Sequence, residues 1–546
     1  MSETRPWVDG LTIFDAFRPV AERHGCRIAV SFPKLLIRRT YAELLWRVDA
    51  VARALLALGI ERGEHIGVWS TNWPEWIELQ LASARVGAVL VNVNPAYRAQ
   101  ELGYALGAAD ITTLFLIESF RESRYFEMLG AVRGACPKLR HAVAIRGSDY
   151  PGIESWDAFL ARGHGVAPEA LDARTAALSP DDVASLQFTS GTTGAPKGAM
   201  LTHRNLLHNA LYVGRALKLT ARDKLCIPVP FYHCFGCVIG TLMCAIHGAA
   251  MVIPAEAFDP TATLQAIAGE RCTAVHGVPT MFIAQLEHPS FAAYDLSSLR
   301  TGIMAGSPCP IEVMRQVIER MGAREMTIAY GQTESSPGIT ITDPDEALEE
   351  RVTTIGRALP GLEVRIVEPG TLQDKPEGEP GELIARGHCV MAGYYRRPEE
   401  TAAAITPDGW LKTGDLGTRT PEGRIKITGR LKDLIIRGGE NVYPREVEEF
   451  LFTEPRIAEA QVVGLPDARL GEEVAAFVRL KEGAAMTPDE VRAYCKGRIA
   501  HFKVPRYVAF VTSFPTTVTG KIQKYRLREM GIEMYGLAAA AAIQTA

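Results

Sequence analysis

Short, continuous runs of apolar residues recur up to about residue 330 and alternate with stretches of helical periodicity. His65–Trp69, Ala88–Val93 and Thr112–Ile117 are three such runs, while Tyr41–Leu58 places its apolar side chains on one helical stripe. Runs of this length are typical of parallel strands that helices bury on both faces. The alternation predicts an α/β fold with layered sheets. It predicts further strands over Val183–Phe188, Leu225–Val229, Ala250–Ile253, Ala274–His276, Thr301–Met304 and Met326–Ala329, and helices over His203–Leu217 and Pro310–Met321.

The composition of the sequence and the length of its apolar runs change after about residue 355. Glycine and proline become frequent and the apolar runs shorten, which predicts a small β-rich subdomain that continues to residue 430. The remaining residues, 433–546, are close to the size of one ordinary domain and are expected to form a small α+β unit. Its expected helices are Val442–Phe452 and Pro488–Ile499, and its expected strands are Glu459–Val463, Glu473–Leu480 and Tyr507–Val511.

Composition excludes several classes of protein. The chain has 546 residues and a net charge of −4, whereas nucleic-acid binders usually carry a strongly basic face. No apolar run approaches the roughly 18 residues of a membrane-spanning helix, and the start of the chain lacks the apolar core of a signal peptide. Ten cysteines in a chain of this size are expected to be free thiols, including the pair Cys234 and Cys237, so the expected location is cytoplasmic.

A loop rich in glycines and hydroxyls follows the predicted strand Val183–Phe188. Residues Thr189–Gly198 read Thr-Ser-Gly-Thr-Thr-Gly-Ala-Pro-Lys-Gly. Glycines let a backbone turn its N–H groups toward an anion, and the hydroxyls and Lys197 add further donors, so the composition suits a polyphosphate. The spacing is not that of a Walker A loop. The alternative from composition alone is a polar surface hairpin.

Six further segments accompany this loop. They are Phe231–Gly236 (Phe-Tyr-His-Cys-Phe-Gly), Gly302–Pro308 (Gly-Ile-Met-Ala-Gly-Ser-Pro), Tyr330–Glu334 (Tyr-Gly-Gln-Thr-Glu), Trp410–Asp415 (Trp-Leu-Lys-Thr-Gly-Asp), Gly429–Pro444 and Pro515–Lys521. Together with the loop, in this order and at this spacing, they make the chain resemble the acyl-adenylate-forming enzymes: acyl-CoA synthetases, adenylation domains of peptide synthetases and firefly luciferase. The resemblance extends over roughly residues 30–530.

The resemblance implies an ATP site in the large domain. The residues expected to hold the β- and γ-phosphates are Thr189, Ser190, Gly191, Thr192, Thr193 and Lys197. Those expected to border adenine are Ala305, Gly306 and Ser307, and Tyr330 is expected to stack on the base. Gly331 and Gln332 are also expected to bind the nucleotide. Thr333 is expected to donate to the α-phosphate, and His233 to lie beside the carboxylate that is activated. Glu334 is expected to bind Mg²⁺, since a carboxylate near a triphosphate needs a cation between them.

The resemblance also implies that the C-terminal part is mobile. Asp415 and Arg430 are expected on the ribose and phosphates, and residues 431–432 form the expected hinge between domains 1–430 and 433–546, with Lys432 as its pivot. Gly438 and Gly439 would leave room for the pantetheine arm of coenzyme A, and Arg437 would meet its phosphates. Lys521 is the lysine expected to bridge the carboxylate and the α-phosphate during adenylation. These roles imply ATP, Mg²⁺ and coenzyme A as cofactors or substrates.

The acid itself is less constrained. In the adenylation domains of peptide synthetases, which the chain resembles, the segment that matches Phe231–Gly236 carries an aspartate for the α-amine of the substrate. Phe231–Gly236 holds no carboxylate, which argues against an amino acid, and few residues follow Lys521, which favours free CoA over a carrier domain as the expected acceptor. Apolar and small residues expected near the acid are Phe235, Cys237, Val278, Gly302, Gly331 and Ile339. They suit an apolar tail, and the segments look most like those of medium-chain fatty acyl-CoA synthetases. An aryl-CoA ligase, a non-catalytic nucleotide-binding protein and a homodimeric assembly are left open.

Overall fold

The computed structural model describes residues 5–147, 149–189, 196–307, 309–438, 440–516 and 522–541. They divide into two compact units, each considered by itself. The first unit comprises Met1–Val364 and Ala385–Leu411, and the second comprises Arg365–Ile384 and Lys412–Ala546. Residues 365–384 and 412–430 therefore group with the C-terminal residues. The hinge at 431–432 stays a prediction. Within the described ranges, no helix is both long and apolar enough to cross a membrane.

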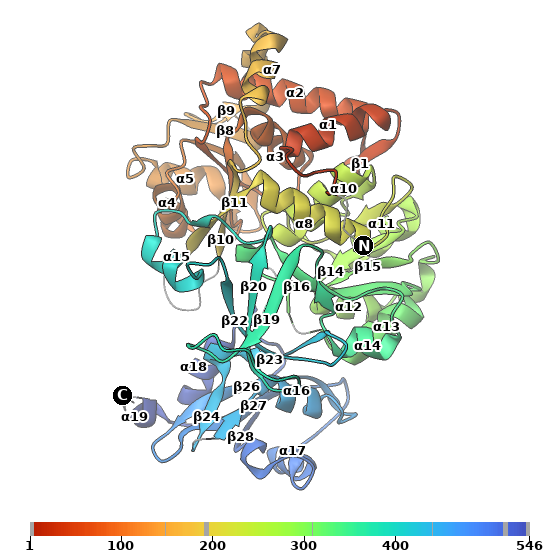
Figure 1. The fold of residues 1–546 in the computed structure, drawn as a ribbon, viewed down its shortest axis with the longest axis vertical. Helices are drawn as coiled ribbons and strands as arrows, with labels where there is room; N and C mark the ends of the chain where they lie inside the picture. The colour runs from red at the N-terminus through yellow and green to blue at the C-terminus, as the bar shows by residue number, and fades with distance from the viewer. Residues whose placement is uncertain are drawn as a thin grey trace. The chain divides into compact units, whose positions relative to one another are not determined.

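An eight-stranded sheet forms one half of the first unit (Figure 1). Its strands, in spatial order, are β21 (Gly393–Tyr394), β11 (Lys197–Thr202), β10 (Val183–Thr189), β4 (Val89–Val93), β3 (His65–Trp69), β5 (Thr113–Ile117), β8 (His141–Arg146) and β9 (Glu154–Ser155). The central strands β4, β3, β5 and β8 are parallel, whereas β11 runs antiparallel to β10 and to β21. Every residue of β3, β4 and β5 is buried, so these apolar runs are parallel strands as predicted.

A nine-stranded sheet forms the other half. Its order is β18 (Arg357–Ala358), β17 (Gly338–Ile341), β16 (Glu325–Gly331), β15 (Thr301–Met304), β14 (Ala274–Gly277), β12 (Lys224–Cys226), β13 (Ala250–Val252), β1 (Ile28–Phe32) and β2 (Ile37–Thr40). Strands β12, β14, β15 and β16 are parallel to one another. The predicted strand Leu225–Val229 is wrong in its extent and ends at Cys226. Pro228 and Pro230 follow it, and proline has no N–H for a sheet ladder.

Helices surround the two sheets. Those of the first unit are α1 (Ile13–Arg23), α2 (Tyr41–Ala57), α3 (Pro74–Val86), α4 (Ala99–Ala108), α5 (Tyr125–Arg133), α6 (Trp156–Arg162), α7 (Pro168–Ala176), α8 (His203–Ala216), α9 (Cys234–Gly236), α10 (Met243–His247), α11 (Pro260–Glu270), α12 (Pro279–Leu286), α13 (Ile311–Arg320), α14 (Leu348–Thr353) and α15 (Pro398–Ala404). Thr40 with Glu43, and Thr202 with Asn205, form capping boxes that fix where α2 and α8 begin. Helix α8 is almost wholly buried, as its place between layers requires.

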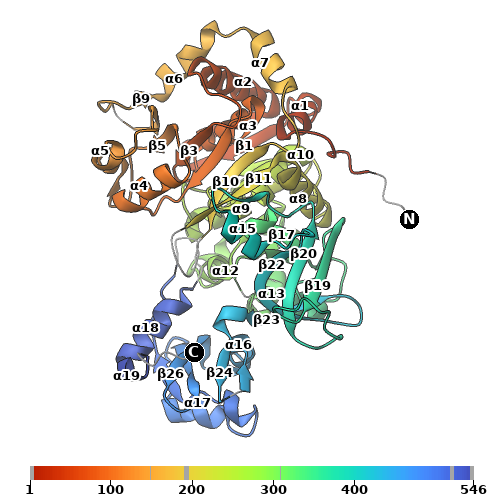
Figure 2. The same ribbon diagram turned by 60° about the vertical axis from the view of Figure 1, so that its left-hand side comes forward.

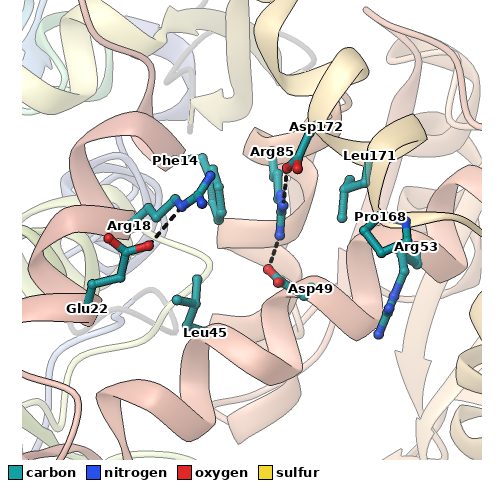
Figure 3. A pocket seen from close by; sticks show the side chains of 10 residues that line it. All are labelled: Phe14, Arg18, Glu22, Leu45, Asp49, Arg53, Arg85, Pro168, Leu171 and Asp172. Atoms are coloured by element: carbon teal, nitrogen blue, oxygen red, sulfur yellow. Dashed lines mark hydrogen bonds and ion pairs between the residues drawn. The ribbon is translucent and has the colours of Figure 1, made fainter.

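Helices α1, α2 and α3 pack against one another, as both ribbon views show (Figures 1 and 2). Arg85 of α3 contacts residues of several neighbouring helices. Its buried guanidinium pairs with Asp49 of α2 and with Asp172 of α7, the latter at 3.0 Å, and lies 4.3 Å from the ring centre of Phe14 in α1. Figure 3 shows these side chains around a depression of about 180 Å³. Because positive and negative charges alternate there, we interpret the cluster as a structural tie between four helices.

The second unit contains two sheets. A four-stranded sheet has the order β19 (Leu362–Val367), β20 (Gly381–Gly387), β22 (Leu411–Arg419) and β23 (Ile425–Arg430), and β22 and β23 are antiparallel. A second sheet has the order β25 (Glu440–Val442), β24 (Ile435–Arg437), β27 (Gly471–Leu480) and β26 (Ile457–Asp467), with β28 (Tyr507–Phe510) parallel to β27. Its helices are α16 (Pro444–Leu451), α17 (Pro488–Cys495), α18 (Lys524–Met534) and α19 (Ala538–Ala541). The expected β-rich segment and α+β unit are confirmed.

Three boundaries in this unit differ from the prediction. Helix α16 begins at Pro444 because Val442 is still paired with Ile435 in a hairpin. Helix α17 ends at Cys495, where Lys496 turns extended and Gly497 takes a φ of +75°. Strand β26 is longer than predicted, because Gly464 and Pro466, which read as breakers, are both paired with β27.

Two buried histidines make stability depend on pH. Burial lowers the pKa of His203 to about 4 and that of His276 to about 4. An unfolded imidazole titrates near 6.5, so between pH 6.5 and 4 the unfolded state binds more protons than the folded one. The free energy of unfolding should therefore fall as pH falls through this window, by up to about 3 kcal/mol per histidine.

Urea unfolding between pH 7 and pH 4 measures this effect. The variant His276→Gln should show a shallower decline than the wild type, since one titrating group is gone. An equal decline in the free energy of unfolding of the two proteins would contradict the lowered pKa assigned to His276.

Candidate active site

The predicted phosphate loop joins two neighbouring antiparallel strands. Thr189 is the last residue of β10 and Lys197 the first of β11, and the two are cross-strand partners. Pro196 is held by the Tyr104 hydroxyl, which donates to its carbonyl at 2.9 Å. Ser190, Gly191, Thr192 and Thr193 lie outside the described residues. The pairing of β10 with β11 thus brings both ends of the loop to the same end of these two strands.

Lys197, on β11, and Glu334, in the turn that follows β16, meet at Tyr394. The Tyr394 hydroxyl donates to Oε1 of Glu334 at 2.7 Å, and the Lys197 ammonium lies 4.5 Å from the centre of the Tyr394 ring. Backbone bonds hold the same three segments together: Met391 N donates to Glu334 O, and Tyr395 N donates to Gly198 O. The expected phosphate lysine and the expected Mg²⁺ carboxylate are therefore close neighbours.

The segment Tyr330–Glu334 begins on strand β16 and ends in a tight turn. A Cβ atom on Gly331 would lie 1.8 Å from the carbonyl oxygen of Pro337, so only glycine fits there. Gln332 N donates to Ser335 Oγ and to Pro337 O, both at 3.0 Å, which fixes the turn. Thr333 and Glu334 follow in the one-turn helix Thr333–Ser335. The turn presents both side chains beyond the carboxyl end of β16.

The aromatic-histidine segment lies beside this turn. His233 is the N-cap of α9, and its Nδ1 accepts a hydrogen bond from Phe235 N at 3.2 Å. The next residue, Cys234, has its Sγ 4.0 Å from Oγ1 of Thr333. A Cβ atom on Gly236 would lie 2.2 Å from the Pro230 carbonyl oxygen, so the segment turns back closely on itself. His233 and Thr333 are thus brought to the same region of the first unit.

The predicted adenine-bordering segment follows the strand next to β16. Ala305 is buried and donates its N–H to Gly277 O at 3.2 Å, Gly306 is exposed with a φ of +89°, and Ser307 is partly exposed. Since β14, β15 and β16 are parallel neighbours, their carboxyl ends share one edge of the sheet. Ligands of open α/β sheets bind at such edges. Ala305–Ser307 and Gly331–Gln332 therefore lie at the same edge of the sheet, and their contact with adenine stays a prediction.

Cys234 and Cys237 are buried free thiols, as predicted. Cys237 Sγ lies 3.4 Å from Nε2 of Gln187 and 3.6 Å from Nδ2 of Asn92, and burial raises the pKa of its thiol well above the usual range. A thiol held protonated is a poor metal ligand and nucleophile. No cluster of three or more metal-binding side chains occurs among the residues that the structure describes.

Asp415 and Arg430 are paired within the second unit. They are cross-strand partners on β22 and β23, and Arg430 Nε lies 2.9 Å from Asp415 Oδ1. Asp415 is buried while half of the Arg430 side chain is exposed. Glu382, also buried, accepts the N–H of Gly414 at 3.1 Å and so supports the turn before Asp415. Burial raises the pKa of the Glu382 carboxyl.

The remaining predicted residues lie further along the second unit. Lys432 is exposed in the one-turn helix Leu431–Asp433, and Gly438 has a φ of +60° in the turn between β24 and β25. Gly439 and Lys521 lie outside the described residues. Arg437 donates two hydrogen bonds, at 2.6 and 3.0 Å, to the buried carboxylate of Glu473. Glu473 also pairs with Arg506 at 3.3 Å, and the role of Arg437 toward CoA phosphates stays a prediction.

Tyr394 is the functional candidate that sequence reasoning missed. It follows Gly393 on β21, a strand of two residues that is too short for any periodicity. The available signal was the pair of tyrosines after a glycine, in Gly393-Tyr394-Tyr395, where aromatic side chains follow a flexible residue. Its partners Lys197 and Glu334 are far away in sequence, so only the fold reveals the contact.

Comparison with known proteins shows the family of the chain. The family description "AMP-binding enzyme" matches residues 17–395, and "AMP-binding enzyme C-terminal domain" matches residues 446–521. The chain is 49% identical over 542 residues to "Putative acyl-CoA synthetase YngI" of Bacillus subtilis (strain 168), a match that covers 96% of this chain and 98% of that protein. It is 43% identical over 543 residues to "Medium-chain acyl-CoA ligase ACSF2, mitochondrial" of Danio rerio, covering 96% and 89%.

A solved structure shares the architecture. The anthranilate CoA ligase AuaEII in complex with anthranoyl-AMP matches with a TM-score of 0.87 and 26% identity, over 97% of this chain and 98% of that one. The chain belongs to the AMP-binding enzyme family. Its identification as an ATP-dependent, AMP-forming acyl-CoA synthetase is thereby confirmed, with a carboxylic acid, ATP and CoA as its substrates.

Proposed function

We propose that this synthetase activates a medium-chain fatty acid, and that Lys197, His233, Thr333 and Glu334 form the adenylation site. The observation that best supports this adenylation site is the convergence of these side chains in one unit. Glu334 and Lys197 both contact Tyr394, and Thr333 lies beside Cys234, the residue that follows His233. The reaction joins the acid to AMP with release of pyrophosphate. Thiol attack by CoA then gives the thioester and AMP.

In the first half-reaction the carboxylate of the acid attacks the α-phosphate of ATP. Both groups are anions, so their negative charge must be neutralised. Lys197 lies at the end of the phosphate loop, where its ammonium can offset the β- and γ-phosphates. Thr333 has a hydroxyl to donate to the α-phosphate, and His233 lies where the acid's carboxylate would be oriented. Lys521 supplies a further positive charge between carboxylate and phosphate. Preorganised donors of this kind stabilise the charge that develops in the transition state.

A single carboxylate fits Mg²⁺ here. Mg²⁺ in nucleotide sites typically takes one or two carboxylates together with substrate phosphates and water, and the described residues hold no larger ligand cluster. Glu334, with Oε1 engaged by Tyr394, would contribute its other oxygen. When bound, the ion would offset phosphate charge.

The second half-reaction requires Lys521 to leave the site, because the thiol of CoA must approach the carbonyl of the acyl-adenylate. We place the pivot at Lys432, in the exposed turn Leu431–Asp433 at the end of β23. Gly438, in its left-handed turn, would leave a narrow passage for pantetheine, with Gly439 beside it. Asp415 would hold the ribose in both states.

The variant Lys432→Pro is expected to impair thioester formation more than adenylation. Proline fixes φ near −65° and so restricts the rotation that exchanges the two states. We expect the rate of octanoyl-CoA formation from octanoyl-AMP to fall about tenfold or more, while ATP–pyrophosphate exchange falls less than about threefold. Single-turnover kinetics of each half-reaction measure the difference. Thioester formation at the wild-type rate would argue against this pivot.

The medium-chain assignment rests on apolar surroundings and on the relatives. Phe235, Cys237, Val278 and Ile339, which are expected near the acid, are all buried, and the Danio rerio relative is named a medium-chain acyl-CoA ligase. Competition among acids from butanoate to palmitate, with benzoate and cinnamate included, tests it. Mass spectrometry of the CoA thioesters should show the C6–C12 products in excess. Benzoyl-CoA as main product would favour the aryl-CoA ligase instead.

A homodimer and a cytoplasmic location stay predictions. Light scattering during gel filtration tests the first, and fractionation of the source cell tests the second.

A further inference from the structure

Tyr394 occupies a position that none of the predicted roles explains. Its side chain is buried, with 7% of its surface exposed, and its strand pairs with β11 so that Tyr394 lies opposite Ala199. Its own N–H donates to Thr401 Oγ1 at 2.9 Å, which fixes the backbone from the other side. A Cβ atom on the preceding Gly393 would lie 2.9 Å from a methyl carbon of Thr401. The backbone of Tyr394 is therefore fixed on both sides, and its side chain is buried.

The Tyr394 side chain contacts two oppositely charged side chains of the predicted phosphate site, Glu334 and Lys197. The hydroxyl donates to Glu334 Oε1 at 2.7 Å, which restricts the carboxylate to one orientation. The ring contacts the Lys197 ammonium, whose distance of 4.5 Å to the ring centre is that of a cation–π interaction.

We propose that Tyr394 is a positioning residue for adenylation: its hydroxyl orients Glu334 toward the metal–phosphate complex, while its ring keeps Lys197 at a fixed distance from that carboxylate. This inference rests on the proposed function of Lys197 and Glu334. It explains why the two residues do not simply pair with each other. A direct ion pair would neutralise both groups, whereas a neutral aromatic spacer leaves the carboxylate for a cation and the ammonium for phosphate.

The test uses the full chain and the variants Tyr394→Phe and Tyr394→Leu, with Tyr395→Phe as matched control. Tyr395 is the next residue, and its hydroxyl also bonds a carboxylate, Asp110 Oδ2 at 3.0 Å, which has no predicted role in the site. Equilibrium dialysis measures ATP binding as a function of Mg²⁺ concentration. Thermal midpoints show that each variant is folded.

Tyr394→Phe should raise the Mg²⁺ concentration for half-maximal ATP binding about 10-fold or more, since loss of a group that orients a metal ligand typically costs 10–100-fold. ATP binding without Mg²⁺ should stay unchanged, because the ring still faces Lys197. Tyr394→Leu should weaken that metal-free binding as well. Tyr395→Phe should match the wild type.

A double-mutant cycle separates positioning from a general structural effect. In a Glu334→Gln background, Tyr394→Phe should change the Mg²⁺ dependence less than about twofold, because the group through which it acts is already gone. A Tyr394→Phe protein with wild-type Mg²⁺ dependence, or one with an equal loss in both backgrounds, would overturn the inference while leaving the proposed function intact. A wild-type protein that binds no ATP at all would overturn both.

Discussion

Replacement of Lys521 by alanine is expected to lower the rate of acyl-adenylate formation by about 10²–10³-fold, while conversion of supplied acyl-adenylate to thioester continues at nearly the wild-type rate. The magnitude is that of losing one preorganised donor to a developing anion, about 3–4 kcal/mol of barrier. The asymmetry follows from the two half-reactions. Only the first brings a carboxylate and a phosphate together, so only the first needs a cation between them.

Octanoyl-AMP, prepared chemically, allows the second half-reaction to be measured alone with CoA. The first is measured as octanoate-dependent ATP–pyrophosphate exchange. Lys524→Ala is a suitable control, because Lys524 lies near in sequence but donates to Glu448 Oε1 at 2.6 Å, within the second unit. Equal losses in both half-reactions of the Lys521→Ala protein would contradict the assigned role.

The substitution Gly331→Ala is expected to have the second-largest effect. The added methyl would lie 1.8 Å from the Pro337 carbonyl oxygen, so the backbone of the turn must move. Thr333 and Glu334 would move with it, and a displacement of about 1 Å at a reacting centre commonly costs about 10²-fold in rate. Exchange activity should therefore fall at least that far. Thermal unfolding should also show a loss of about 1–3 kcal/mol, typical of overpacking.

A glycine in open space provides the control for that substitution. Gly107 lies in helix α4, and a Cβ atom there would meet nothing within 4 Å. Gly107→Ala should keep full activity and should stabilise the protein by up to about 1 kcal/mol, since alanine favours helix. If Gly331→Ala behaved like this control, the crowding inferred around the turn would be wrong.

Most of the fold was accessible from the sequence because burial on both faces leaves a strong signal. The runs at His65–Trp69 and Thr301–Met304 are strands with the predicted bounds, and α13 lies within one residue of its predicted ends. The errors occurred where local chemistry competes with pattern. Prolines shortened the strand at Leu225–Val229, while strand pairing across Gly464 and Pro466 overrode residues that usually end a strand.

The site was predictable segment by segment but not as an arrangement. Gly331 and Gly236 belong to predicted segments, yet the carbonyl oxygens that exclude a side chain at each come from the folded chain. The contact of Cys234 with Thr333 joins residues from separate parts of the sequence. Tyr394 was missed for the same reason, because a two-residue strand gives no pattern and its importance arises only from its two partners.

Acid-dependent ATP–pyrophosphate exchange tests the central claim most directly. The wild-type protein should incorporate labelled pyrophosphate into ATP with octanoate and Mg²⁺, far more slowly with benzoate, and not at all without an acid. Exchange that is faster with benzoate than with octanoate would contradict the medium-chain assignment. Absence of exchange with every acid tested would contradict adenylation itself.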